Sequence, residues 1–413
     1  MASRHAGRAV CPAAAPAGRP RIVFVMNSIL TGGAERALGT MLRTANGRLN
    51  QYEIHLVLLD REPDRRKMPQ VDQRHCLDAG GSLWRSAARL DRLLKRLKPD
   101  LVVSLLVRSN YACALVGPRH AKATVLCERM HLGSHLAGRY RGMKLAALRL
   151  MPRLFYRRAT RVLGVSEGVR RDLVDHFGVP ETLTGTIPNG YYLDEIVAAG
   201  AQAPAIPLPP DYIVAVGRLV RAKGFSLLIE AYHRADPPVP LLILGEGTER
   251  AALQADIDRR GLGARIRLLG FLEDPFTIVS RAQFLVSASH NEGFPNAIAE
   301  AMVLGRPVLA SDCPSGPAEL LGGRSGGPGI VIEAPNGLIV PDHDVDALSA
   351  GLRRLTGDAA LRDRLGAAAR RRMQDFSVGS VTSRYWDIFD RLIGLSPADA
   401  CDQPPRPAKR SRR

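Results

Sequence analysis

The sequence predicts an α/β protein made of two doubly wound, Rossmann-like domains that face each other across a cleft. Three observations support this class. Strand-like apolar runs alternate with helical patterns, the alternation occurs in two series, and a proline-rich segment separates the series. Strands that alternate with helices at this rhythm form βαβ units with parallel strands. A length of 413 residues accommodates two domains of ordinary size.

The first series begins with the apolar run RIVFVM at 21–26, which is typical of a buried parallel strand. A loop that contains Gly32 and Gly33 follows and leads into a helical pattern. A further helix is expected at 83–98. Further strands are expected at 52–59, 100–106, 123–127 and 161–165. We therefore assign residues 21–200 to an N-terminal Rossmann-like domain.

The stretch AAGAQAPAIPLPPD at 198–211 is rich in alanine and proline and has no periodicity, so residues 201–211 are expected to be a linker. A second domain is expected at 212–377, and a last helix at 378–393 follows it. The strands expected in this second domain are 212–217, 240–245, 265–270, 282–289 and 306–311.

Both ends of the chain are expected to be disordered. Prolines interrupt residues 1–20, which makes this stretch a poor signal peptide, and residues 394–413 are proline-rich and basic. No run of 18 apolar residues occurs, which argues against a membrane-spanning helix. Six scattered cysteines without a CxxC pattern indicate reduced thiols in a cytosolic protein and no metal site.

The net charge of +18 is distributed unevenly. Residues 1–200 carry 32 Lys and Arg against 16 Asp and Glu, a net of +16, whereas residues 201–400 carry 21 against 23, a net of −2. This asymmetry indicates an anionic partner, either nucleic acid or a membrane surface. A genome rich in G and C would explain the total arginine content but not its asymmetry.

Segment 139–161 holds eight basic residues and no acidic one, interleaved with Leu, Met, Phe and Tyr. A basic amphipathic stretch of this kind suits an anionic membrane surface. The alternative is an ordinary helix that packs on the first domain with its arginines in solvent.

The run VGRLVRAKGF at 216–225 places Arg218 and Lys223 in the loop beyond a strand. Two such cations can straddle a diphosphate, although random surface loops also often hold both residue types. The run LGEGTER at 244–250 lacks the third glycine of the dinucleotide fingerprint. Its two glycines fit either a phosphate close to the backbone or a tight turn.

The run HNEGFP at 290–295 forms the loop after a strand and leads into a helix. Amide groups from Gly293 onward would be partly unpaired there and would form an anion site. Glu292 precedes this helix and Glu300 lies in it, roughly 10 Å apart because a helix rises ~1.5 Å per residue. Acid/base pairs that flank one bond lie roughly 5–9.5 Å apart. The two glutamates therefore fit the ends of an elongated ligand, such as a nucleotide diphosphate sugar, unless they are ordinary helix-leading and solvated acids.

Together these motifs resemble the signature of the retaining glycosyltransferases of family 4, the group 1 transferases with a GT-B fold. GRLVRAKGF is similar to the diphosphate-binding loop of this family, and TGGAER to its N-terminal glycine-rich loop. The resemblance extends from about residue 21 to residue 393. The residues that fit the signature are Ser289, Glu292, Gly293, Phe294, Glu300, Ala301, Met302, Gly305, Pro307 and Val308.

The resemblance implies a retaining hexosyltransferase. It would take a hexose or N-acetylhexosamine from a nucleotide diphosphate sugar whose nucleotide is UDP. The acceptor would be a glycan or a lipid-linked molecule, in the synthesis of cell-surface polysaccharide or glycolipid. It implies that Arg218 and Lys223 bind the diphosphate, Glu292 the donor sugar and Glu300 the ribose. It also implies that Gly32, Gly33, Gly293 and Phe294 belong to the donor site.

No cofactor and no divalent metal are expected, because the two cations and the helix amides would stabilise the departing diphosphate. The spaced aspartates of PDHDVD at 341–346 are interpreted as a helix start. The resemblance also implies that domain 21–200 binds the acceptor, that domain 212–377 binds the nucleotide sugar, and that the helix 378–393 returns to the first domain.

The run CERMHLGSH at 127–135 offers Glu128, Arg129, His131 and His135 in the first domain. The resemblance indicates a histidine close to the reacting sugar, and His131 is the better candidate, although a lone histidine is usually structural.

Two other functions stay open. A nucleotide-sugar epimerase would share the fold, and a basic nucleic-acid-binding protein would explain the charge. No nucleic acid is expected as a partner, because the sequence contains no RRM, KH, zinc or helix-turn-helix signature. The expected location is cytoplasmic, peripheral on the inner face of the cytoplasmic membrane.

Overall fold

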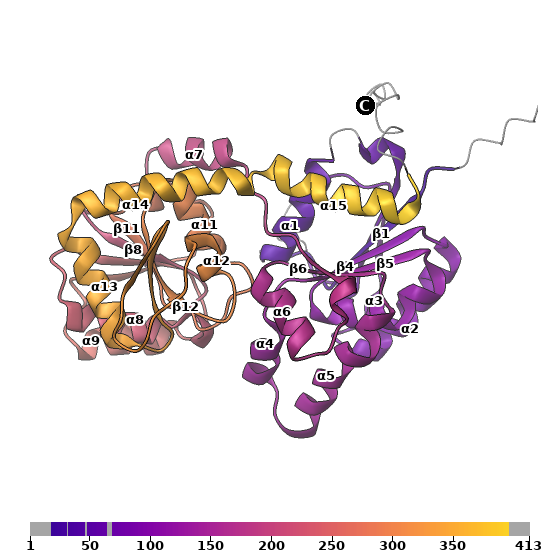
Figure 1. Cartoon of the computed structure of the whole chain (residues 1–413), viewed down its shortest axis with the longest axis horizontal. Coiled ribbons are helices and arrows are strands. Elements are labelled where there is room, and N and C mark those ends of the chain that lie inside the picture. Colours follow the sequence, from indigo (N-terminus) through magenta and orange to yellow (C-terminus); the bar gives the residue numbers. More distant parts are fainter. Residues whose placement is uncertain (1–17, 31, 46–47, 64–67, 396–413) are drawn as a thin grey trace, which may run out of the picture.

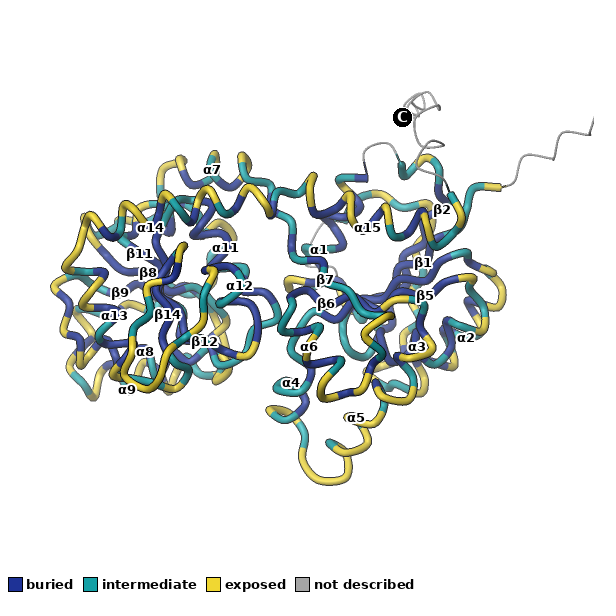
Figure 2. Tube along the Cα trace, viewed as in Figure 1, coloured by how far each residue is buried: buried dark blue, intermediate teal, exposed yellow. Residues whose placement is uncertain are grey.

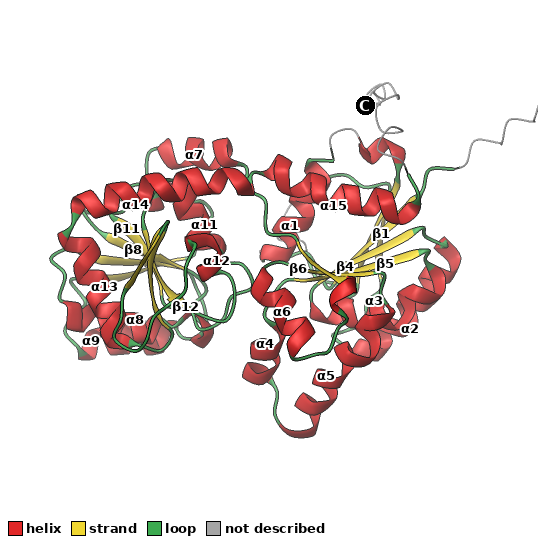
Figure 3. Ribbon diagram, in the orientation of Figure 1, coloured by secondary structure: helices red, strands yellow, loops and turns green. Residues whose placement is uncertain are grey.

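The computed structural model describes residues 18–30, 32–45, 48–63 and 68–395, which form two domains side by side (Figure 1). Each domain contains a seven-stranded sheet that is covered by helices (Figure 3). The predicted α/β class with two doubly wound domains is confirmed. Of the predicted tails, residues 1–17 and 396–413 lie outside the described residues.

The first sheet has the strand order β3-β2-β1-β4-β5-β6-β7, and all its pairs are parallel. Its strands are β1 (Arg21–Met26), β2 (Glu53–Leu58), β3 (Gln73–Cys76), β4 (Leu101–Leu105), β5 (Ala123–Glu128), β6 (Arg161–Gly164) and β7 (Thr184–Thr186). Its helices are α1 (Gly33–Arg43), α2 (Leu83–Leu97), α3 (Val107–His120), α4 (Leu132–Arg139), α5 (Gly142–Phe155) and α6 (Glu167–Asp175). The short strands β3 and β7 were not predicted, because QRHC and TGT are polar edge strands without an apolar run.

The central strand β1 is buried on both sides, as expected for a strand in a doubly wound sheet. Val23 and Val25 belong to a cluster with residues of α2 and α3. Phe24 and Met26 belong to a second cluster with residues of α1 and the last helix. The alternation of side chains along the strand thus supplies two apolar layers.

The second sheet has the order β10-β9-β8-β11-β12-β14-β13, and β13 is its antiparallel edge strand. Its strands are β8 (Ile213–Val216), β9 (Leu241–Leu244), β10 (Ile266–Gly270), β11 (Phe284–Ser287), β12 (Val308–Asp312), β13 (Ile332–Ala334) and β14 (Gly337–Pro341). Its helices are α8 (Phe225–Ala235), α9 (Arg250–Arg259), α10 (Phe276–Val279), α11 (Asn296–Val303), α12 (Pro317–Leu321), α13 (Val345–Gly357) and α14 (Ala359–Arg372).

The chain crosses between the domains twice, and the two crossings lie together. The backbone N–H of Tyr191 donates to the carbonyl of Phe376 at 2.9 Å, and the N–H of Val378 donates to the carbonyl of Tyr191 at 2.9 Å. The ring of Phe294 packs against both crossings, with centroid distances of 6.5 Å to Tyr191 and 5.7 Å to Phe376.

Helix α7 (Leu193–Ala201) packs on the second domain, against α10 and α11. A Cβ added to Gly200 would lie 2.5 Å from Cδ2 of Leu304, so the helix approaches this domain closely. By sequence position we placed these residues in the first domain. In space the first domain ends before α7, because the first crossing precedes this helix.

The last helix, α15 (Val378–Ile393), lies on the first domain (Figure 1). The indole Nε1 of Trp386 donates to the carbonyl of Met41 at 3.2 Å, and the rings of Phe389 and Phe24 make an edge contact at 6.2 Å. Across the described parts of the chain, no helix has both the length and the apolar content needed to cross a bilayer.

Candidate active site between the two domains

The loops at the carboxyl ends of the two sheets meet at Gly293. A Cβ added to this residue would lie 2.1 Å from the carbonyl oxygen of Arg129 and 2.8 Å from Cα of Met130. Gly293 follows β11 and Arg129 follows β5, so the two domains touch at the edges where α/β sheets place their ligands. Only glycine allows this backbone contact.

Further contacts join the domains on either side of Gly293. The carboxylate of Glu319 on α12 accepts the backbone N–H groups of Glu167 and Gly168, both at 2.8 Å, at the start of α6. On the other side, a Cβ on Gly33 would lie 3.0 Å from Nδ2 of Asn296. The glycine-rich loop of the first domain therefore faces the start of α11.

Lys223 and Glu292 form an ion pair within the second domain. Their side chains are 21% and 11% exposed, so water screens the pair only partly. The surrounding loops are fixed by backbone contact, since a Cβ on Gly224 would lie 1.9 Å from the carbonyl oxygen of Ala288. Lys223 and Glu292 come from two different sequence motifs and are 69 positions apart, yet their side chains are in direct contact.

The side chain of Arg218 is exposed and makes no hydrogen bond or ion pair within the described part of the chain. His135 lies on α4 of the first domain. Burial lowers the pKa of His135, and the positive charges of Arg139 and Arg218 lower it further. The loop after β8 therefore presents a free cation toward the first domain.

Glu300 lies buried on α11 and pairs with Arg36 on α1 of the first domain. The Glu300 carboxylate raises the pKa of the Arg36 guanidinium, against the opposing effect of burial. The sequence did not reveal this pair, because the two residues are 264 positions apart and lie in different domains. Arg36 is the arginine of the TGGAER run.

The start of α11 has no side-chain cap. Its first residue, Asn296, accepts hydrogen bonds from Nδ2 of Asn189 at 2.8 Å and from the hydroxyl of Tyr191 at 2.7 Å. The helix start is therefore positioned by the first interdomain crossing, and its amide end faces the meeting point of the loops.

Two of the expected donor-site residues have local packing partners. Phe294 is buried against the interdomain crossings, so its ring stabilises the crossing, and a contact of this ring with donor stays a prediction. Gly32 is the N-cap of α1, and a Cβ there would lie 2.5 Å from Oε2 of Glu35. Thr31, which precedes it, lies outside the described residues.

His131 caps α4. Its Nδ1 accepts the backbone N–H of Ser134 at 3.3 Å, and its Nε2 lies 3.6 Å from Oδ1 of Asp172. Burial lowers the pKa of His131, and the Asp172 carboxylate opposes this effect. Both ring nitrogens thus face groups of the first domain, which is a structural role. The predicted catalytic role of His131 stays a prediction.

Glu128 and Arg129 are also engaged. Burial raises the pKa of Glu128 to about 7, although hydrogen bonds from Asn110 and Tyr156 oppose the shift. Nη1 of Arg129 donates to the hydroxyl of Tyr385 on α15 at 3.2 Å. These two residues join β5 to its neighbours and leave the site to other side chains.

The structure also shows the contacts of the runs LGEGTER at 244–250 and PDHDVD at 341–346. A Cβ on Gly245 would lie 1.9 Å from the carbonyl oxygen of Gly217, and one on Gly247 would lie 2.2 Å from that of Leu219. These glycines let two loops pack backbone to backbone, and a phosphate contact there stays a prediction. Asp344 accepts the N–H of Ala347 at 2.8 Å and caps α13, so PDHDVD is a helix start as predicted.

The matching family models and two named relatives are all glycosyltransferases. The model described as Glycosyltransferase Family 4 matches residues 31–195, and the one described as Glycosyl transferases group 1 matches residues 200–372. A relative from Campylobacter jejuni is the N-acetylgalactosamine-N,N'-diacetylbacillosaminyl-diphospho-undecaprenol 4-alpha-N-acetylgalactosaminyltransferase. It is 27% identical over 377 residues, which are 89% of this chain and 98% of the relative.

A second relative is the lipopolysaccharide core biosynthesis glycosyltransferase LpsD of Rhizobium meliloti. It is 28% identical over 307 residues, 74% of this chain and 79% of the relative.

Solved structures share the fold. The sucrose-phosphate synthase of Thermosynechococcus elongatus superposes with a TM-score of 0.74 at 21% identity, over 92% of this chain and all of the other. Anabaena HepE, solved in complex with UDP and glucose, superposes with a TM-score of 0.67 at 19% identity, over 90% of this chain and all of the other.

Proposed function

This chain belongs to the family 4 glycosyltransferases with the GT-B fold. We propose that it moves a hexose or N-acetylhexosamine from a UDP-sugar to a lipid-linked or glycan acceptor. We propose further that the anomeric configuration of the sugar is retained. One observation carries the proposal. Arg218, the Lys223–Glu292 pair and Glu300 gather where the loops of both sheets meet. The names of the relatives support the acceptor class, since they mention diphospho-undecaprenol and lipopolysaccharide core.

The donor would lie along the carboxyl edge of the second sheet. Among the described residues the Arg218 side chain has no hydrogen-bond or ion-pair partner, so it can bind diphosphate oxygens, and Lys223 lies on the same loop. The uncapped amides of α11 supply a further positive dipole. Glu292 would turn from Lys223 to the sugar hydroxyls, and Glu300 would exchange Arg36 for the ribose.

Transfer would then depend on electrostatic stabilisation of the leaving diphosphate. The bond from the anomeric carbon to the diphosphate oxygen breaks, and the acceptor hydroxyl forms its new bond on the face that the diphosphate vacates. The hydroxyl proton passes to the departing diphosphate oxygen. Glu292 positions the sugar in this step and does not act as a nucleophile. We propose that the two cations and the helix amides suffice without a divalent metal.

Helix α5 supports an acceptor held at a membrane. It packs one partly buried apolar row against the domain, formed by Leu145, Leu148, Met151 and Phe155. On the opposite face Met143, Leu150 and Leu154 are 91%, 50% and 49% exposed. At 3.6 residues per turn these three lie in one line along the helix. An ordinary packed helix would expose polar residues there.

Figure 2 shows α4 and α5 at one end of the first domain, with α5 mostly exposed. The basic residues of segment 139–161 flank the exposed apolar row. An amphipathic helix with apolar side chains outside and cations beside them binds an anionic bilayer surface. We include peripheral membrane binding, at the cytoplasmic face, in the proposed function.

The test is a panel of radiolabelled UDP- and GDP-sugars with membrane extract as acceptor, in buffer that contains EDTA. The proposal expects label from a UDP-sugar in the lipid or glycan fraction. Activity that is lost in EDTA and restored by Mg²⁺ or Mn²⁺ would overturn metal independence. Epimerisation or hydrolysis of a UDP-sugar without any acceptor would instead assign the chain to the epimerases.

A further inference from the structure

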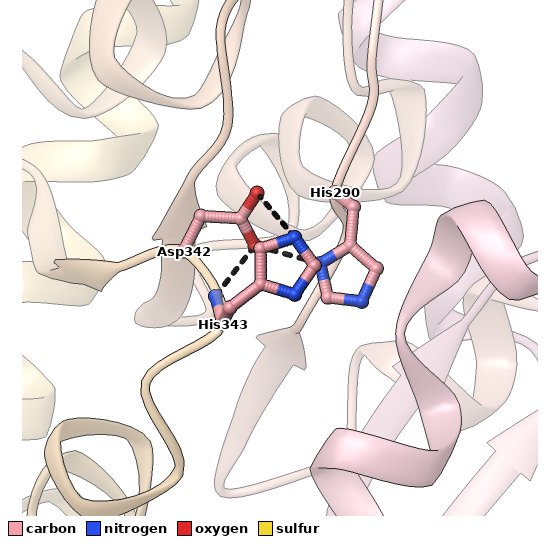
Figure 4. Close-up of side chains that lie close together, drawn as sticks. All are labelled: His290, Asp342 and His343. Atoms are coloured by element: carbon pink, nitrogen blue, oxygen red, sulfur yellow. Dashed lines mark hydrogen bonds and ion pairs between the residues drawn. The ribbon is translucent and has the colours of Figure 1, made fainter. Parts of the chain in front are cut away.

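Two histidines and an aspartate gather beside the proposed donor residues (Figure 4). His290 follows β11, whereas Asp342 and His343 follow β14, and β12 lies between these strands in the sheet. Parallel strands bring their carboxyl ends to one edge, so residues 52 positions apart meet there. The proposed transfer uses none of these three side chains.

The Asp342 carboxylate lies at the edge of the two stacked imidazole rings, close to one nitrogen of each. Its Oδ1 is 2.7 Å from Nδ1 of His290, and its Oδ2 is 3.6 Å from Nε2 of His343. The rings stack with centroids 3.9 Å apart and planes within 9° of parallel. One ligand atom from each residue lies within 4.8 Å of the others.

The cluster is open to solvent on one side. The side chains of His290 and Asp342 are each 20% exposed, whereas that of His343 is 70% exposed. An ion can therefore enter past His343, while the other two groups are held by the protein.

The geometry points to a binding site for a divalent transition-metal ion of the zinc class, held by His290, Asp342 and His343. Two imidazoles and one carboxylate form a ligand set of protein zinc sites, and water takes the remaining position. Mg²⁺ and Ca²⁺ prefer oxygen ligands and fit two imidazoles poorly. Because the two ring planes are nearly parallel, the imidazoles must turn out of their stack before both can form metal bonds of about 2 Å.

The site is coupled to the donor loop. His290 lies two residues before Glu292, and its backbone N–H donates to the carbonyl of Ala222 at 2.9 Å, next to Lys223. Burial raises the pKa of the Cys313 thiol, and the carboxylates of Glu292 and Asp342 raise it further. A bound metal would hold this loop in one position.

The experiment is a titration of the purified full-length chain, stripped with EDTA and dialysed, with ZnCl₂ in a calorimeter. His343→Ala and Asp342→Asn each remove one ligand. His233→Ala is the matched control, because His233 is an exposed histidine of the same domain that lies outside the cluster. None of the three variants changes a residue of the proposed donor site.

We expect wild type and His233→Ala to bind one Zn²⁺ per chain, and both ligand variants to bind it at least about tenfold more weakly, or 1.4 kcal/mol. Zinc should also raise the melting temperature of wild type but not of His343→Ala, since an ion that binds only the folded state stabilises it. The Co²⁺ complex should show d–d absorption without a thiolate charge-transfer band.

Equal zinc affinity in wild type and His343→Ala would overturn the site. A thiolate band in the Co²⁺ complex would also overturn it, by assigning the metal to a cysteine such as the exposed Cys76. These readouts do not use sugar transfer, so they stand apart from the proposed function.

Discussion

The loop edge of the second domain and helix α5 of the first domain differ in what they leave exposed. At the loop edge, Gly224 and Gly293 touch neighbouring backbone where no side chain fits, and the Lys223–Glu292 pair is mostly buried. Along α5, only Pro152 is buried. The loop edge thus holds groups at fixed positions, as chemistry requires, whereas α5 offers a surface that tolerates many positions of its partner.

The two domains that contain these regions also differ in net charge. The residues up to 200 carry a net charge of +16, and residues 201–400 carry −2. A donor diphosphate needs a few cations placed individually. An anionic surface responds to the sum of many cations, and its attraction is screened by salt. Variants at the loop edge should therefore change catalysis, whereas variants on α5 should change location.

The largest effect is expected from the ion pair at the loop edge. Glu292→Gln and Lys223→Ala should each lower the transfer rate by on the order of 10²–10³, because each removes a group that contacts charge in the transition state. Arg221→Ala is the matched control, since Arg221 is an exposed cation of the same loop. Steady-state transfer measured below the melting temperature of each variant is the readout. Near-native turnover in either variant would show that the substituted residue does not take part in transfer.

A smaller loss is expected from the contact between the domains. Gly293→Ala adds a Cβ that would lie 2.1 Å from the carbonyl oxygen of Arg129, so the loop edges must separate. Displacement of reacting groups by about 1 Å costs roughly 10²-fold in rate. The control is Gly379→Ala on α15, where a Cβ meets nothing within 4 Å. Unchanged kcat/KM together with an unchanged scattering profile would show that domain approach is not required.

The sequence predicted the buried strands better than it predicted the contacts between loops. The buried strands β1 and β8 were predicted from apolar runs, because burial on both faces leaves a continuous hydrophobic segment. The Lys223–Glu292 site was predicted as two separate motifs, and their contact was not. Motifs reveal residue types, whereas contacts between loops depend on the packing of whole sheets.

Long-range contacts account for what the sequence did not predict. Arg36 meets Glu300 only when the domains close, and α7 joins the second domain through Gly200 and Leu304. The role expected for His131 stays a prediction, and its local contacts were not visible in the sequence. The sequence shows a histidine near the right strand but does not show that its ring caps a helix and faces Asp172.

An intermediate effect is expected at Glu300. Glu300→Ala should raise the donor KM about tenfold with little change in kcat, because a ribose contact is equal in the ground and transition states. Arg36→Ala provides the comparison, since it breaks the same interdomain pair and keeps the carboxylate. If Arg36→Ala matched Glu300→Ala in both constants, the interdomain pair and not the ribose contact would explain the loss. A lower kcat with unchanged KM would also contradict the ribose role.

The smallest effect on transfer itself is expected from α5 and the turn after it. If this surface docks on anionic lipid, each basic residue near the bilayer contributes about 1 kcal/mol. Vesicle binding should rise with the fraction of anionic lipid and fall with salt, since surface charges are screened within about 10 Å at 0.1 M. The variant replaces four exposed arginines by glutamine: Arg149, Arg153, Arg157 and Arg158.

This variant should leave the vesicles, while transfer to a short soluble acceptor analogue stays near the wild-type rate because the donor residues lie in the other domain. The control removes the same charge from exposed arginines of the second domain: Arg259, Arg267, Arg370 and Arg371. Co-sedimentation with vesicles compares the three proteins. Loss of binding in both variants would indicate a response to net charge alone. Equal binding by all three would show that α5 is an ordinary surface helix, because then neither its cations nor the total charge would hold the protein to lipid.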